Sequence, residues 1–150
     1  MASKHKALSA LGVALALLIV ASAALAANQV KGGSYKGSLT PARDGALISF
    51  KVSSSAKQVT ALSVSNTPLY CEGGGPPTPV RFKNASISAG GTFSSTGQWV
   101  IKEGPKKGKV GTKLKITGKF LKGKAEQGTI TTTYVGFPKC SGKSAYSTKA

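Results

Sequence analysis

The side chains that most often perform catalysis are nearly absent from this sequence. Its one histidine, His5, lies before a long apolar run, which leaves the rest of the chain without Ser-His or Cys-His nucleophiles and without imidazole metal ligands. The four acidic residues are Asp44, Glu72, Glu103 and Glu126, and we expect them in separate turns or strand ends. No spacing selects a carboxylate pair. We therefore expect no catalytic, cofactor-binding or metal-binding residue, and no enzymatic activity.

Lysine is the charged residue that is abundant. The chain has 21 Lys and Arg against 4 Asp and Glu, a formal charge of +17, and only Arg43 and Arg81 are arginines. Without Lys4 and Lys6 the charge is still about +15. Residues 106–124 contain eight lysines and no acid. They form the predicted basic surface: Lys106, Lys107, Lys109, Lys113, Lys115, Lys119, Lys122 and Lys124.

Three roles are open for these lysines. They can form a solvated face that keeps a sheet soluble and blunts its edges, or attract anionic cell-wall polymers or a membrane surface by charge. Nucleic acid is the third candidate. It is disfavoured because stacking aromatics are missing from the stretch and arginine, the usual reader of base edges, is rare.

The start of the chain predicts an exported protein. A charged beginning is followed by an apolar, alanine-rich run and by Ala24-Leu25-Ala26, which matches the small-x-small site of a signal peptidase. We expect a helical signal peptide over residues 1–26 and a single domain over residues 27–150, secreted or associated with the cell envelope. A retained membrane anchor is the alternative, since the apolar run is long enough to span a bilayer.

Short alternations of apolar and polar residues predict an all-β fold. In residues 112–120, Leu114, Ile116 and Phe120 fall on one face of a strand and the lysines fall on the other. Eight or nine such strands predict a two-layer antiparallel β-sandwich, Ig-like or jelly-roll-like, with a closed barrel as the alternative. The predicted core consists of Tyr35, Ile48, Phe50, Leu62, Phe82, Phe93, Leu114, Ile116, Phe120 and Ile130.

Two local irregularities are also predicted. Gly45 ends the segment Pro-Ala-Arg-Asp-Gly and supplies the positive φ of a hairpin connection. Val59 is out of phase with Leu62 and Val64, which predicts a β-bulge or bend between them.

The chain resembles a group of small exported proteins and domains that are abundant in high-GC Gram-positive bacteria and have no assigned activity. The resemblance rests on an ordered set of motifs: GSYKG, ISFKVS, a lone Cys in a Gly-rich loop, SISAGGTFSS, ITGKFLKGKAEQGTI and CSGKSAYSTKA. It covers nearly all of residues 27–150. Two features depart from the group: Tyr146 stands where a Trp is frequent, and the charge is richer in lysine. The resemblance implies a β-sandwich with a Cys71–Cys140 bond and no catalytic residue.

Cys71 and Cys140 are the only cysteines. An oxidising compartment favours a disulfide between them, and two free thiols are the alternative.

Two functions follow as hypotheses. The first is an exported, non-enzymatic β-sandwich protein that associates with the anionic envelope through its lysines. The second is a carbohydrate- or ligand-binding module that uses an exposed aromatic such as Trp99, provided that this side chain is not simply part of the core.

Overall fold

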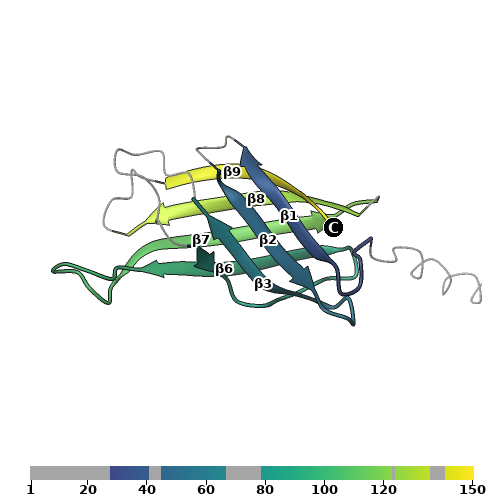
Figure 1. The fold of residues 1–150 in the computed structure, drawn as a ribbon, viewed down its shortest axis with the longest axis horizontal. Helices are drawn as coiled ribbons and strands as arrows, with labels where there is room; N and C mark the ends of the chain where they lie inside the picture. The colour runs from purple at the N-terminus through teal and green to yellow at the C-terminus, as the bar shows by residue number, and fades with distance from the viewer. Residues whose placement is uncertain (1–27, 41–44, 67–78, 123, 136–140) are drawn as a thin grey trace, which may run out of the picture.

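The structure is a computed structural model of the chain and describes residues 28–40, 45–66, 79–122, 124–135 and 141–150. These residues form nine β-strands and no helix (Figure 1). The strands are β1 (Ser34–Thr40), β2 (Leu47–Val52), β3 (Gln58–Ser65), β4 (Val80–Arg81), β5 (Ala85–Ser86), β6 (Thr92–Val100), β7 (Val110–Phe120), β8 (Ala125–Tyr134) and β9 (Ser141–Lys149).

All nine strands belong to one antiparallel sheet that bends over on itself. The order along the sheet is β4-β3-β2-β1-β9-β8-β7-β6, and β5 pairs with β3. Figure 1 shows β1, β2 and β3 crossing in front of β6 to β9 as a second layer. The two ends of the sheet meet where Phe82, after β4, bridges to Gly97 of β6, and where the Lys83 N–H donates to the Thr96 carbonyl at 3.2 Å. The sheet is therefore nearly closed and barrel-like.

The all-β prediction is confirmed, and the antiparallel pairing with it. Each layer contributes one apolar face, as the alternation requires. The two layers are not separate sheets, because the hydrogen-bonded pairing of β1 with β9 joins one layer to the other.

All ten predicted core residues are buried. At the centre of the core, an aromatic cluster joins the two layers. The rings of Tyr35 and Phe50 stack with centroids 4.9 Å apart, and Phe120 meets Tyr35 edge-on at 5.4 Å. Phe93 lies 5.7 Å from Phe120. Offset-stacked and edge-to-face pairs are the geometries that aromatic rings prefer, so the cluster fixes how the layers sit on each other.

Both predicted irregularities are present. Gly45 has φ of 73°, in the left-handed region that glycine adopts without strain. The β2–β3 register shifts between Ser49 and Lys51, and Ala61 takes φ of 51°. This bulge lets Val59, Leu62 and Val64 all face the core although their spacing does not fit one uninterrupted strand.

Two strands are longer than expected. The sequence suggests separate strands around Phe93 and Trp99, but β6 runs through both. Between Phe93 and Trp99, the inward positions of β6 are Ser95 and Gly97. Because neither residue is large and apolar, the sequence does not show the alternation there. Likewise β8 begins at Ala125, in a segment expected to be a turn.

Three predictions lie outside the described residues. They are the signal peptide over residues 1–26, the Gly- and Pro-rich loop after Cys71, and the disulfide between Cys71 and Cys140.

Candidate functional site

The outward side chains of three neighbouring strands form the candidate site. On β7, Lys113, Lys115 and Lys119 are exposed and alternate with core residues, as the sequence predicts. We call the outward residues of β6, β7 and β8 the lysine face. They are Thr92, Ser94, Thr96, Gln98, Lys113, Lys115, Thr117, Lys119, Gln127, Thr129, Thr131 and Thr133.

Each lysine of this face has uncharged polar residues on both sides. Lys115 pairs across the sheet with Thr96 on β6 and Thr131 on β8. Directly opposite residues in an antiparallel pair have Cβ atoms about 5 Å apart. A ligand that reaches an ammonium group therefore also meets hydroxyl groups that can donate or accept hydrogen bonds.

Four cationic side chains surround a depression where the sheet closes. Arg81 and Lys83 flank Phe82 on the segment that bridges to β6, and their exposed side chains face the same depression as Lys113 and Lys115. It has a volume of about 700 Å³ and also includes Thr96, Gln98, Thr131 and Thr133. We call it the cationic depression.

Gly97 allows this closure. A Cβ atom at position 97 would lie 3.1 Å from Cγ of Phe82 and 3.0 Å from the Arg81 carbonyl oxygen. Only glycine, which has no side chain, lets the segment that contains Arg81 and Phe82 approach β6 so closely. Arg81 and Lys83 then lie two strand spacings from β7, roughly 10 Å, while alternate residues along a strand are about 7 Å apart. The cations form a spaced array, which suits a ligand with several anionic groups.

No carboxylate of the described residues lies on the lysine face. Glu103 is exposed in the loop between β6 and β7, and Glu126 is inside the sheet with 1% of its surface exposed. Among the described residues, the outward surface of the lysine face therefore carries positive charge only.

The eight lysines of the predicted basic surface occupy three places. Lys113, Lys115 and Lys119 are on the lysine face. Lys106, Lys107 and Lys109 lie in the loop between β6 and β7, at one end of β7. Lys122 and Lys124 lie at its other end, between β7 and β8. An extended strand of 11 residues spans roughly 35 Å, so a stretch compact in sequence is spread out in space.

Arg81 and Lys83 were missed by reasoning from the sequence. The signal was present, since both alternate with the buried residues Val80 and Phe82. It was short, however, and only the bridge to β6 brings these cations to Lys113 and Lys115.

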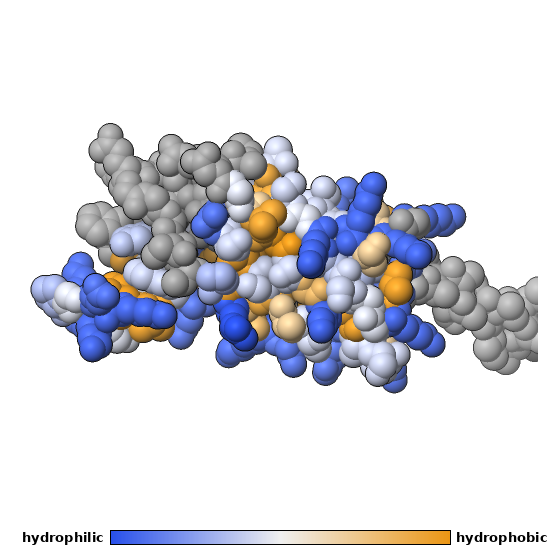
Figure 2. Space-filling view, in the orientation of Figure 1, coloured by the Kyte–Doolittle hydropathy of each residue, from blue (hydrophilic) through white to orange (hydrophobic). Residues whose placement is uncertain are grey.

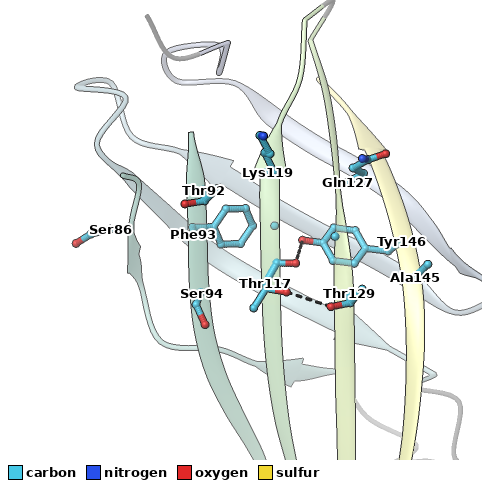
Figure 3. Close-up of a pocket in the computed structure, with 12 residues that line it drawn as sticks. Ser86, Thr92, Phe93, Ser94, Thr117, Lys119, Gln127, Thr129, Ala145 and Tyr146 are labelled. Carbon is cyan, nitrogen blue, oxygen red and sulfur yellow. Dashed lines mark hydrogen bonds between the residues drawn. The ribbon is translucent and has the colours of Figure 1, made fainter. Parts of the chain in front are cut away.

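A second depression of about 780 Å³ lies on the same outer surface and is nearly uncharged (Figure 3). Its rim carries Thr92, Ser94, Thr117 and Thr129, with Lys119 as the one cation among its lining residues. The hydroxyls of Thr117 and Thr129 are hydrogen-bonded at 3.0 Å. Figure 3 shows the rings of Phe93 and Tyr146 beneath it, pointing toward each other from β6 and β9.

A buried polar cluster lies under this depression. Glu126 Oε1 accepts a hydrogen bond from the Tyr146 hydroxyl at 2.7 Å, and Oε2 accepts one from the Thr148 hydroxyl at 2.8 Å. Gly118 makes the space, because a Cβ there would overlap the Glu126 carboxylate and the rings of Phe93 and Tyr146. Glu126, expected in a turn or at a strand end, is the second residue of β8, and its side chain is buried inside the sheet.

Burial controls the protonation of this cluster. Loss of hydration raises the pKa of Glu126 to about 7, although the hydrogen bonds from Tyr146 and Thr148 act in the opposite direction. Burial also raises the pKa of Tyr146, and the neighbouring Glu126 charge adds to the effect. At neutral pH the carboxyl group is thus close to its midpoint of protonation.

Trp99, the candidate aromatic ligand contact, and Tyr146 differ in exposure. Tyr146 is buried as part of the core, so it is not available to an external ligand. Trp99 is half-buried, packs against the core and covers Gly111, whose ideal Cβ would lie 2.7 Å from Cζ3 of the indole ring.

Comparisons of the chain with protein-family models, with curated protein sequences and with solved structures found no match. Within the described ranges, no three His, Cys, Asp or Glu side chains gather as metal ligands would. Within the same ranges no helix has the length and apolar character needed to cross a membrane.

Proposed function

We propose that this is an exported, non-enzymatic β-protein that binds anionic polymers of the cell envelope through the cationic depression and the adjoining lysine face. The observation that carries the proposal is the cationic depression, in which Arg81 and Lys83 from one segment and Lys113 and Lys115 from another surround a single hollow. Export is inferred from the leader-like residues 1–26, and the non-enzymatic role from the absence of histidine after His5.

The arrangement favours a polymer with repeated phosphate or carboxylate groups over a single small anion. Three of the four cations are lysines, which act as point charges on flexible stems and do not impose a planar geometry on the ligand. Their spacing along and across the strands matches a ligand that presents several charges in succession. The neighbouring threonine hydroxyls supply hydrogen bonds for uncharged groups between those charges.

Binding of exported protein to immobilised poly(glycerol phosphate) tests the proposal. We expect a variant with Arg81, Lys83, Lys113 and Lys115 changed to Gln to bind at least tenfold more weakly than the wild type in 0.1 M salt. The matched control changes four exposed lysines outside the lysine face to Gln: Lys36, Lys51, Lys57 and Lys149. It has the same net charge and should lose much less affinity.

Two results would contradict the proposal. Equal losses in the two variants would show that binding follows net charge and not the lysine face. Tighter binding to duplex DNA than to poly(glycerol phosphate), at equal phosphate concentration and salt, would reassign the face to nucleic acid. Circular dichroism of each variant checks that the fold is unchanged.

A further inference from the structure

The end of the β6–β7 hairpin has an unusual surface that the proposed function does not use. In Figure 1 this hairpin projects beyond the other strands. Its loop is held by backbone hydrogen bonds: the Ile101 N–H donates to the Lys109 carbonyl at 2.9 Å, and the Gly108 N–H donates to the Ile101 carbonyl at 2.9 Å. The projecting segment is thus an ordered turn whose side chains have defined positions.

Both faces of the hairpin end are apolar. On one face, Trp99 and Ile101 lie together over Gly111, whose ideal Cβ would be 2.7 Å from the indole and 3.0 Å from Ile101 Cγ1. Val100 lies between them in sequence and so projects to the opposite face, where it pairs with Val110 across the hairpin. A hairpin that only needed to be soluble would carry polar residues on at least one of these faces.

The apolar surface is exposed and includes Val135, which directly follows β8. Val100 is 36% exposed and Val135 is 43% exposed, and these are two of only three large hydrophobic residues exposed in the described part of the chain. The Val135 N–H donates to the Gly111 carbonyl at 2.8 Å, which places Val135 beside the hairpin. Figure 2 shows apolar surface at this end of the molecule between hydrophilic side chains.

Lysines surround the apolar residues. The loop carries exposed Lys102, Lys106, Lys107 and Lys109 against one acid, Glu103. Lysine side chains extend their charged ends away from an apolar surface while their stems remain on it. Together, a half-exposed tryptophan, exposed aliphatic side chains and a ring of lysines match the chemistry of the boundary between anionic headgroups and acyl chains.

We propose that the β6–β7 hairpin end docks onto an anionic lipid surface, with Val100 and Val110 entering the interfacial layer, the loop lysines contacting the headgroups, and Trp99 directly behind these valines on the opposite face of the hairpin. The occupant is a lipid surface and not a protein groove because the feature is a convex projection with charge around it. This site is separate from the cationic depression and needs neither Arg81 nor Lys83.

Trp99 reports directly on this docking because it is the only tryptophan in the chain. Exported protein is mixed with vesicles of phosphatidylcholine containing about 30% phosphatidylglycerol. We expect a blue shift of Trp99 emission and quenching by lipids brominated near the headgroup. Vesicles of phosphatidylcholine alone should produce neither, and they also detect any binding by a retained apolar leader.

Two variants test the two chemical parts of the hairpin. Val100→Ser should weaken binding roughly fivefold, since it removes one exposed aliphatic side chain from the interface. Changing Lys102, Lys107 and Lys109 to Gln should weaken it on the order of 100-fold, because each lysine near an anionic surface contributes about fivefold. Leu47→Ser is the control, as Leu47 is 56% exposed but lies on β2.

Three outcomes would overturn the proposal: no change in Trp99 emission with anionic vesicles, equal losses for Val100→Ser and Leu47→Ser, or the same emission shift with soluble poly(glycerol phosphate). The four-residue variant of the cationic depression separates the two sites. It should keep the Trp99 shift with vesicles even if it no longer binds the polymer, so failure of one proposal leaves the other measurable.

Discussion

Glu126 places an ionisable group inside the sheet with a partner for each of its oxygens. The Tyr146 hydroxyl that donates to Oε1 also lies 3.3 Å from the Thr117 carbonyl oxygen. When the carboxyl takes up a proton, this hydroxyl can turn to Thr117 and accept the new O–H. Both protonation states therefore keep their hydrogen bonds, which explains how the core tolerates the residue.

We predict that this residue makes the protein less stable as pH rises. The pKa of Glu126 is about 7 in the folded protein and 4.5 as its reference, so the folded state binds the proton more tightly between these values. The stabilisation of the folded state by this tighter proton binding is complete below about pH 4.5 and is lost as pH rises through 7. At about 1.4 kcal/mol per pKa unit, the loss is roughly 3 kcal/mol. Denaturant unfolding at pH 5 and pH 8 measures it.

Glu126→Gln is the control for that measurement. It keeps the shape of the side chain and removes its titration, so the difference between pH 5 and pH 8 should largely disappear. Residues 27–150 contain no histidine, which keeps this pH window nearly free of other side-chain titrations. A pH dependence that is equally steep in the variant would assign the effect to other groups.

The burial of Glu126 shows what the sequence could and could not predict at a single residue. The alternation that places Ile130 and Thr132 inside continues backwards through Gly128 to Glu126. The sequence nevertheless predicts that residues 122–128 turn the chain, and a buried carboxylate is costly unless it is paired. Its partners, Tyr146 and Thr148, lie 20 and 22 positions away, and only the β8–β9 register brings them together.

Among the elements, β7 was predictable as one strand, whereas β6 was predictable only as two separate strands around Phe93 and Trp99. In β7 every inward residue from Leu114 to Phe120 except Gly118 is large and apolar, so the alternation is plain in the sequence. In β6 the inward positions Ser95 and Gly97 are small and lie under the closing segment. Closure depends on contacts between Phe82 and Gly97, and no local pattern in either segment predicts them. The cationic depression follows from the closure, so it was also not predictable.

The Cys71–Cys140 disulfide remains a prediction and concerns the segments that join the strands. A bond closing a loop of about 70 residues should stabilise the fold by roughly 4 kcal/mol. We expect Cys71→Ser and Cys140→Ser to lower the free energy of unfolding by similar amounts, and the double variant to lose no more than either. A thiol assay that finds two free thiols in exported, unreduced protein would disprove the bond.

At the scale of the whole molecule, positive charge covers more than the lysine face. Lys36 of β1 and Lys149 of β9 are exposed opposite each other, and Lys51 is exposed on β2. A surface of one sign creates a field that attracts any polyanion from a distance, before a particular site is reached. The specific effect of the lysine face is therefore the affinity that it adds to this general attraction.

We predict that binding to poly(glycerol phosphate) falls steeply with salt, because the Debye length shrinks from about 10 Å at 0.1 M to about 3 Å at 1 M. The slope of log affinity against log salt should be shallower in the cationic-depression variant than in the control variant of equal charge, since fewer counterions are released on binding. Titration by calorimetry across a salt series gives the slopes. Undiminished binding at 1 M salt would require a contact that is not electrostatic.

The pairing of β1 with β9 also governs the order in which the fold can be completed. Lys36 pairs with Lys149, so one edge of β1 stays open until β9 is available. Contacts between such distant segments form slowly, because a long loop must close before they contribute. A chain that passes end-first through a narrow channel would stay unfolded until its final strand arrives. If the protein is exported as proposed, the connection that joins the two layers would form only after β9 has crossed the membrane.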